Sequence, residues 1–114
     1  MERKITCITG ASRGIGLALV KQYLDQGYLV DAVSRNSERI LVNHKYENSL
    51  DRVSADITSE KGINLVKDRI AEQGEVNVVI HNAGQLVYKP FSAITREDLK
   101  EVYDINVFAP FMLT

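Results

Sequence analysis

Short β-branched apolar runs alternate with segments of helical periodicity, and this alternation constrains the sequence more than any other feature. Four runs predict strands, at Ile5 to Thr9, Tyr28 to Val33, Arg52 to Ala55 and Val76 to Ile80. Three segments predict helices: Gly14 to Gln26 with Gly27 as its stop, Ser59 to Gln73, and a helix from Arg96 onward after a capping box of Thr95 and Asp98. The polar segment 37–50 predicts a short helix and a loop. Chains with this order form parallel sheets through right-handed crossovers. We therefore predict one α/β domain over residues 1–114, a doubly wound parallel sheet of about four strands with helices on both faces.

Composition and charge narrow the classes of function. The 114 residues suffice for one buried core, and 14 basic against 15 acidic side chains leave a net charge of −1. We therefore expect no nucleic-acid partner and no membrane partner. No apolar run approaches the roughly 20 residues of a membrane span, and no leader-like segment is present. A single cysteine cannot form an internal disulfide, so the expected compartment is the cytoplasm. No cluster has metal-ligand spacing, and no metal is predicted.

The segment Thr9 to Gly16, Thr-Gly-Ala-Ser-Arg-Gly-Ile-Gly, joins the first predicted strand to the first predicted helix. Its glycines allow a sharp turn and the close approach of a phosphate. The start of the helix offers free N–H groups and the positive end of its dipole. The spacing differs from the usual Gly-x-Gly-x-x-Gly fingerprint, and no P-loop Lys follows. By itself the segment is compatible with a phosphate site or with an ordinary strand-to-helix turn.

Four motifs together resemble the short-chain dehydrogenase/reductase family. After the glycine turn, Asp56 follows the third strand, Asn82-Ala83-Gly84 follows the fourth, and Asn106 lies in the last helix. The resemblance covers essentially the whole chain, as the N-terminal half of the family's domain. It implies a Rossmann-like fold and hydride transfer between a nicotinamide cofactor and a carbonyl or secondary alcohol substrate. It also implies that the cofactor is bound by Gly10, Ser12, Arg13, Gly14, Ile15, Gly16, Ser34, Arg35, Asp56, Ile57, Asn82, Ala83 and Gly84.

Two arginines favour NADP over NAD as the cofactor. Arg13 lies within the glycine turn, and Arg35 follows the second predicted strand directly after Ser34. An acidic residue at the second position would bond the ribose 2′-hydroxyl of NAD, whereas Arg can pair with a 2′-phosphate. No acidic residue stands there. The two arginines resemble those of NADP-preferring members of the family.

Asn106 has an unusual position for an amide. It follows Leu99 by seven residues, Val102 by four and Tyr103 by three, which predicts that it shares an inward, apolar helix face. A buried amide needs a partner such as a backbone carbonyl or water. Asn106 could therefore be a satisfied structural residue. The resemblance implies instead a catalytic role, in which it holds a water that feeds a proton relay to the catalytic Lys.

Three further polar or reactive residues lie in predicted strands or directly after one. His81 takes the place of the first Asn in the family's Asn-Asn-Ala-Gly motif, and we expect a structural histidine at the end of a buried strand. Cys7, between β-branched neighbours, predicts an inert core thiol. Asp31 interrupts an otherwise apolar strand, and the sequence offers no reason for it.

The family's chemistry also requires a Ser and a Tyr-x-x-x-Lys pair. None of the five tyrosines has a Lys four residues after it. The tyrosines are Tyr23, Tyr28, Tyr46, Tyr88 and Tyr103, and the residues at the fourth position after them are, in the same order, Gly27, Ala32, Leu50, Ser92 and Val107. We therefore expect this chain alone to be inactive, and a complete enzyme to reduce or oxidise its substrate. The alternative function is a non-catalytic NADP(H)-binding module or an oligomerisation subunit.

The fourth predicted strand suggests self-association. At the end of the sheet, Val76 to Ile80 would be an exposed apolar edge that another chain could cover. In many members of the family the helix that begins near Arg96 packs between subunits. We therefore expect a homo-oligomer.

Overall fold

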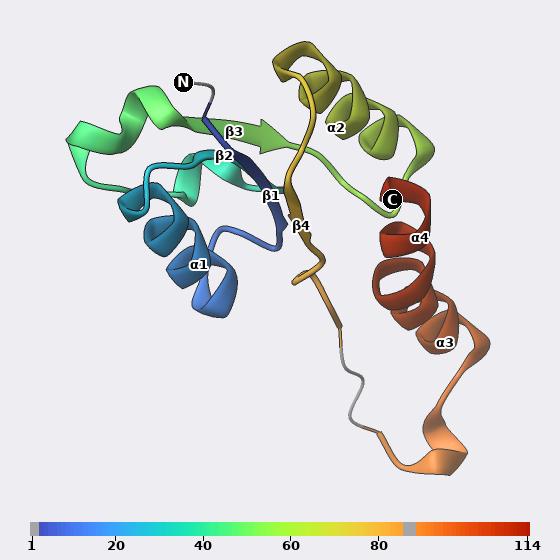
Figure 1. Cartoon of the computed structure of the whole chain (residues 1–114). Coiled ribbons are helices and arrows are strands. Elements are labelled where there is room, and N and C mark those ends of the chain that lie inside the picture. The colour runs from blue at the N-terminus through green and yellow to red at the C-terminus, as the bar shows by residue number, and fades with distance from the viewer. Residues whose placement is uncertain (1–2, 86–88) are drawn as a thin grey trace.

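The computed structural model describes residues 3–85 and 89–114, and it contains the expected α/β architecture (Figure 1). Four strands form one sheet in the order β3-β2-β1-β4, and every neighbouring pair is parallel. The strands are β1 (Ile5–Thr9), β2 (Leu29–Ser34), β3 (Leu50–Ser54) and β4 (Val78–Ile80). The chain proceeds outward from β1 to β3 and then returns to the other side of β1. The strand order thus reverses beside β1, and such a reversal opens a crevice at the carboxyl ends of the strands.

Helices connect these strands. They are α1 (Gly14–Asp25), α2 (Glu60–Gln73), α3 (Arg96–Tyr103) and α4 (Ala109–Leu113), with a π-helical turn over Asp104–Phe108 between the last two. Thr95 and Asp98 form the predicted capping box at the start of α3. The polar segment 37–50 contains two short 3₁₀ helices, Ser37–Arg39 and His44–Ser49, and a third spans Phe91–Ala93.

The sheet is covered on both faces, as the sequence predicts. On one face Val20 and Leu24 of α1 pack against Ile8 and Val30 of the central strands. On the other face Cys7 and Val33 share a buried cluster with Val66 of α2 and Ala109 of α4. These two helices lie side by side on that face (Figure 1). Cys7 is buried, as expected.

The fourth strand differs from its prediction. It pairs as a strand only over three residues. Just before it, the main-chain N–H of Asn77 donates to the carbonyl of Ile5 (2.9 Å), and the side-chain oxygen of Asn77 accepts the N–H of Ile5 (2.8 Å). The apolar run of β4 is typical of a strand covered on both faces, but Val79 is 42% exposed, in line with the edge position expected for this strand. The reason is that β4 is the outermost strand of this sheet. After β4 the chain runs away from the sheet and returns through α3 and α4, which gives an elongated molecule of 55 × 25 × 20 Å (Figure 1).

Among the described residues, no helix combines the length and the apolar character that a membrane crossing requires.

Candidate cofactor site

The glycine turn between β1 and α1 depends on all three of its glycines. Gly10 and Gly14 adopt left-handed backbone conformations, with φ of +64° and +58°. Gly16 allows close packing, because a Cβ there would lie 2.0 Å from the carbonyl oxygen of Gly10. The main-chain N–H of Ala11 donates to the carbonyl of Val33 (3.2 Å), which joins the turn to the end of β2. The spacing that the sequence offers is thus required by the backbone.

The first turn of α1 is chemically suited to an anion. Its N-cap, Arg13, makes no side-chain cap hydrogen bond, and the first turn contains no acidic residue. The N–H groups of the first turn therefore have no internal carboxylate to neutralise them. Arg13 and Ile15 are exposed at this end of the helix, and Ser12 is half-buried. A phosphate would find N–H donors, the helix dipole and a guanidinium together.

The loop after β4 is fastened to the glycine turn. The side-chain Nδ2 of Asn82 donates to the carbonyl of Gly10 (3.1 Å), and the N–H of Ala83 donates to the hydroxyl of Thr9 (3.1 Å). A Cβ on Gly10 would lie 2.9 Å from Cα of Ala83, so the two segments touch. The structure thus brings two of the sequence motifs, distant in the chain, into direct contact.

Thr9 was not among the predicted site residues, although its position at the end of an apolar strand could have indicated that its hydroxyl needs a partner. It ends a buried strand and is itself 1% exposed, so its hydroxyl needs a partner. That partner is the loop after β4.

The ends of β2 and β3 form the other side of this edge. The N–H of Ala55 donates to the carbonyl of Ser34 (3.1 Å), so the residues that follow the two strands lie close together. Arg35 is exposed there. Ser37 and Ser54 are joined through their hydroxyls, a contact that sequence reasoning missed. This edge therefore combines hydroxyl groups with a guanidinium.

Asp56 is held in its ionised form. The hydroxyl of Thr58 (2.6 Å) and the N–H of Thr58 (3.0 Å) both donate to Oδ1 of Asp56. These bonds, with a smaller contribution from the charge of Arg35, keep the pKa of Asp56 below its ordinary value. Ile57 is 6% exposed, so its side chain belongs to the core, and only its main chain can face a ligand.

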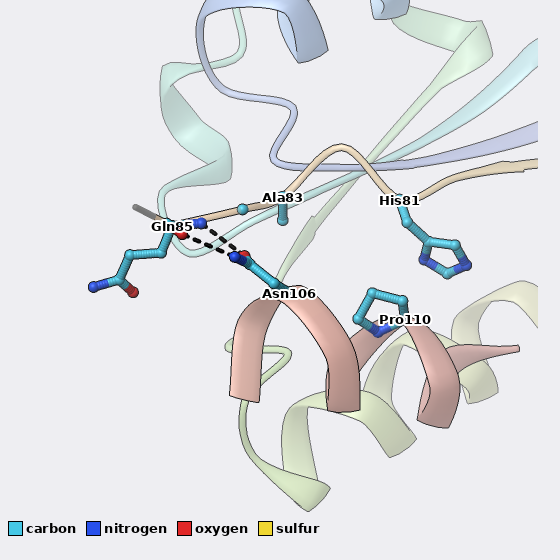
Figure 2. Close-up of a pocket in the computed structure, with 6 residues that line it drawn as sticks. His81, Ala83, Gln85, Asn106 and Pro110 are labelled. Carbon is cyan, nitrogen blue, oxygen red and sulfur yellow. Dashed lines mark hydrogen bonds between the residues drawn. The ribbon is translucent and has the colours of Figure 1, made fainter. Parts of the chain in front are cut away.

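Asn106 lies against the loop after β4 (Figure 2). Its Oδ1 accepts the N–H of Gln85 and its Nδ2 donates to the carbonyl of Gln85, both at 2.8 Å. These reciprocal bonds satisfy the amide, as expected for a residue that needs a partner. Gln85 contributes only main-chain atoms to them, and no side-chain pattern in the sequence could have identified it.

The predicted surroundings of Asn106 are wrong. Leu99 is 51% exposed, Tyr103 is 52% exposed, and Asn106 is exposed as well. The helical spacing is correct, but helix α3 has no buried residue, because nothing in residues 3–85 and 89–114 covers that side. The expected inward face is a surface.

A cavity of about 570 Å³ opens beside Asn106. Figure 2 shows His81 and Pro110 on its other side. His81 is exposed, and its Nε2 lies 3.0 Å from the hydroxyl of Thr114. It is thus not a buried structural histidine, because the β4 strand that precedes it lies at the edge of the sheet. In the part of the chain that the structure describes, no three potential ligands gather in a way that could hold a metal ion.

Comparisons with known proteins identify the family. Residues 4–114 match the family model described as short chain dehydrogenase, and the chain belongs to the short-chain dehydrogenase family. It is 30% identical over 112 residues to an NADPH-dependent 3-dehydrocapnine reductase from Ornithobacterium rhinotracheale, which covers 94% of this chain and 39% of the relative.

Solved structures agree with this assignment. A short-chain dehydrogenase from Streptomyces avermitilis superposes with a TM-score of 0.92 at 29% identity and covers 100% of this chain. A 4-hydroxyisoleucine dehydrogenase complexed with NADH gives 0.86 at 30% identity and covers 97%. This chain spans 43% and 46% of those two proteins. It therefore corresponds to the N-terminal portion of the family's Rossmann-like fold, and relatives are named with NADPH as well as with NADH.

Proposed function

We propose that this chain forms the dinucleotide-binding part of an NADP(H)-preferring oxidoreductase that acts on a carbonyl or secondary alcohol. By itself the chain binds the cofactor without turnover, because it has no Tyr-x-x-x-Lys pair. One observation carries the proposal. At the carboxyl edge of the sheet lie an uncapped helix start, two glycines with no room for a Cβ (Gly10 and Gly16), and the exposed Arg35.

Each group has a part in binding. The first-turn N–H groups of α1 would hold the pyrophosphate. Because Gly16 has no side chain, the start of α1 can pack closely against the carbonyl of Gly10 and keep these N–H groups in place. Arg35 would pair with a 2′-phosphate, which NADP carries and NAD lacks. Ionised Asp56 would accept a hydrogen bond from the adenine. When bound, the nicotinamide supplies hydride transfer to or from the substrate carbon.

Asn106 serves here as a positioning residue. Its two bonds to Gln85 fix the loop after β4, and that loop is fastened to the glycine turn through Asn82. The relay role that the resemblance implies would need the Tyr-Lys pair of a complete enzyme. In this chain the amide keeps Gly84 and its neighbours in place beside the cavity.

The test is a titration of the chain with NADPH and, separately, with NADH. We expect NADPH to bind at least about tenfold more tightly, which corresponds to roughly 1.4 kcal/mol. Arg35→Asp should abolish that preference, because it replaces the cation by a carboxylate that repels the 2′-phosphate. Arg96→Asp makes the same charge change at an exposed position on α3 and should leave the preference intact. Equal binding of the two cofactors by the unaltered chain would contradict the assignment of Arg35.

We further propose that the chain self-associates, which is the second candidate function. The supporting observation is an uncovered apolar surface on α3, the π-helical turn and α4, including Leu99, Tyr103, Val107, Phe108, Phe111 and Met112. A second copy of the chain would cover part of it. Light scattering should show a mass that falls from dimer to monomer in a Phe108→Ser/Phe111→Ser variant. A strictly monomeric unaltered chain at high concentration would rule this out.

The buried, unpaired thiol of Cys7 is compatible with a cytoplasmic protein.

A further inference from the structure

Asp31 is a buried carboxyl group for which the cofactor site has no use. It lies in the middle of β2, and its relative exposure is 0%. In the sheet it pairs with Cys7 of β1 on one side and with Asp51 of β3 on the other. Because side chains alternate along a strand, Asp31 shares a face with Val33, which belongs to the cluster covered by α2. Neither carboxyl oxygen has a hydrogen-bond partner among residues 3–85 and 89–114.

The groups around Asp31 offset its charge only in part. On β1 the neighbour is the Cys7 thiol, and on β3 it is Asp51, a second acid. The cation on this face is Arg69 of α2, which forms its ion pair with Asp51, and Gln73 of the same helix also donates to Asp51 (3.5 Å). Helix α4, packed beside α2, contains no charged residue. Asp51 therefore has the available partners, and Asp31 faces a like charge.

A lone carboxylate in such a place is strongly unfavourable, since burial removes its hydration and no partner replaces it. Buried acids in this situation take up a proton instead. We propose that Asp31 is a protonated carboxylic acid in the folded chain at mildly acidic pH, where an exposed aspartate is already ionised, so that the packing of α2 on the sheet is linked to proton binding. Rising pH then weakens the fold from within its core.

The electrostatic environment agrees with the geometry. Burial, with a further contribution from the charge of Asp51, raises the pKa of Asp31 to about 6 from an ordinary value of 3.8, and the opposing contributions of Gln73 and Arg69 are smaller. Burial and the charge of Asp31 raise the pKa of Cys7 to about 12. For an acid whose pKa is raised by folding, the stabilisation is complete below the unfolded pKa and is lost as the pH rises through the folded pKa. The window therefore runs from about pH 4 to somewhat above pH 6.

The first experiment uses the unaltered chain. A carbon-13 NMR titration of the aspartate carboxyl groups should show one that ionises near pH 6, and Asp31→Asn should remove that signal. If instead every aspartate of the folded chain ionises below about pH 4, the proposal is overturned, whether or not the variant folds.

The second experiment measures urea unfolding from about pH 3.5 to pH 7 for the unaltered chain and for Asp31→Asn, a neutral side chain of the same shape. The two pKa values differ by about two units, so the folding constant of the variant should rise roughly a hundredfold relative to the unaltered chain across this window. Asp68→Asn makes the same change on the exposed side of α2 and should show no such rise. A constant ratio for Asp31→Asn would contradict the proposal.

Discussion

The part of the molecule from β1 to α2 and the part from β4 to α4 are built on the same kinds of sequence pattern but differ sharply in burial. Of the buried hydrophobic residues in the part of the chain that the structure describes, the first part contains all but Ala109. In the second, Phe111 is 78% exposed and α3 has no buried residue. Periodicity therefore defines which side of an element is apolar, while burial depends on whether another segment is present to cover that side.

We expect the largest difference between the two parts in the loss of stability that a glycine-to-alanine substitution causes. Gly16→Ala would place a Cβ 2.0 Å from the carbonyl oxygen of Gly10, and the backbone of the turn would have to move. We expect a loss of roughly 4 kcal/mol in the free energy of unfolding, together with loss of dinucleotide binding.

Gly84→Ala is the matched change in the second part. There the nearest atom to a Cβ is Oδ1 of Asn106, at 3.4 Å. Urea unfolding should show a cost below about 1 kcal/mol. Equal costs for the two variants would mean that the loop after β4 is packed as tightly as the glycine turn.

We expect a smaller difference between the two parts in the loss of stability that a leucine-to-alanine substitution causes. Leu24 of α1 is 2% exposed, so Leu24→Ala should lower the free energy of unfolding by about 3 kcal/mol through lost contacts and a cavity. Leu99 of α3 is 51% exposed, and Leu99→Ala should cost about 0.5 kcal/mol or less. Thermal and urea unfolding at low protein concentration would measure both.

The same leucine pair can also show whether the second part is covered by another copy. If the cost of Leu99→Ala grows with protein concentration while that of Leu24→Ala does not, Leu99 is buried between chains. If the cost of Leu99→Ala stays small at every protein concentration, Leu99 is exposed in solution as it is in the single chain, and the two parts differ in burial as described.

The order of strands and helices could be predicted because it depends on local spacing. The run Ile5 to Thr9, the stop at Gly27 and the capping box at Thr95 are features of a few neighbouring residues, and each is present in the structure. The contact between the loop after β4 and the glycine turn joins Asn82 to Gly10, 72 residues apart. The sequence motifs suggested that both belong to one site, but not which atoms meet.

What the sequence could not predict depends on three-dimensional neighbours. The edge position of β4 was expected, but the partner of Asn106 is a main-chain segment with no side-chain signature. The environment of Asp31 arises from the pairing of β2 with β3 and from the ion pair that Arg69 of α2 makes with Asp51 of β3. None of these relations is a spacing along the chain.

The elongated shape of the molecule affects how its mass must be measured. Its radius of gyration is 15.1 Å, against about 13 Å for a compact domain of this length. A particle that is more than twice as long as it is wide meets extra friction in solution and leaves a size-exclusion column ahead of a sphere of equal mass. An early elution position would therefore be produced by a single chain as well as by a pair. Sedimentation equilibrium, which is independent of shape, is the technique that separates the two.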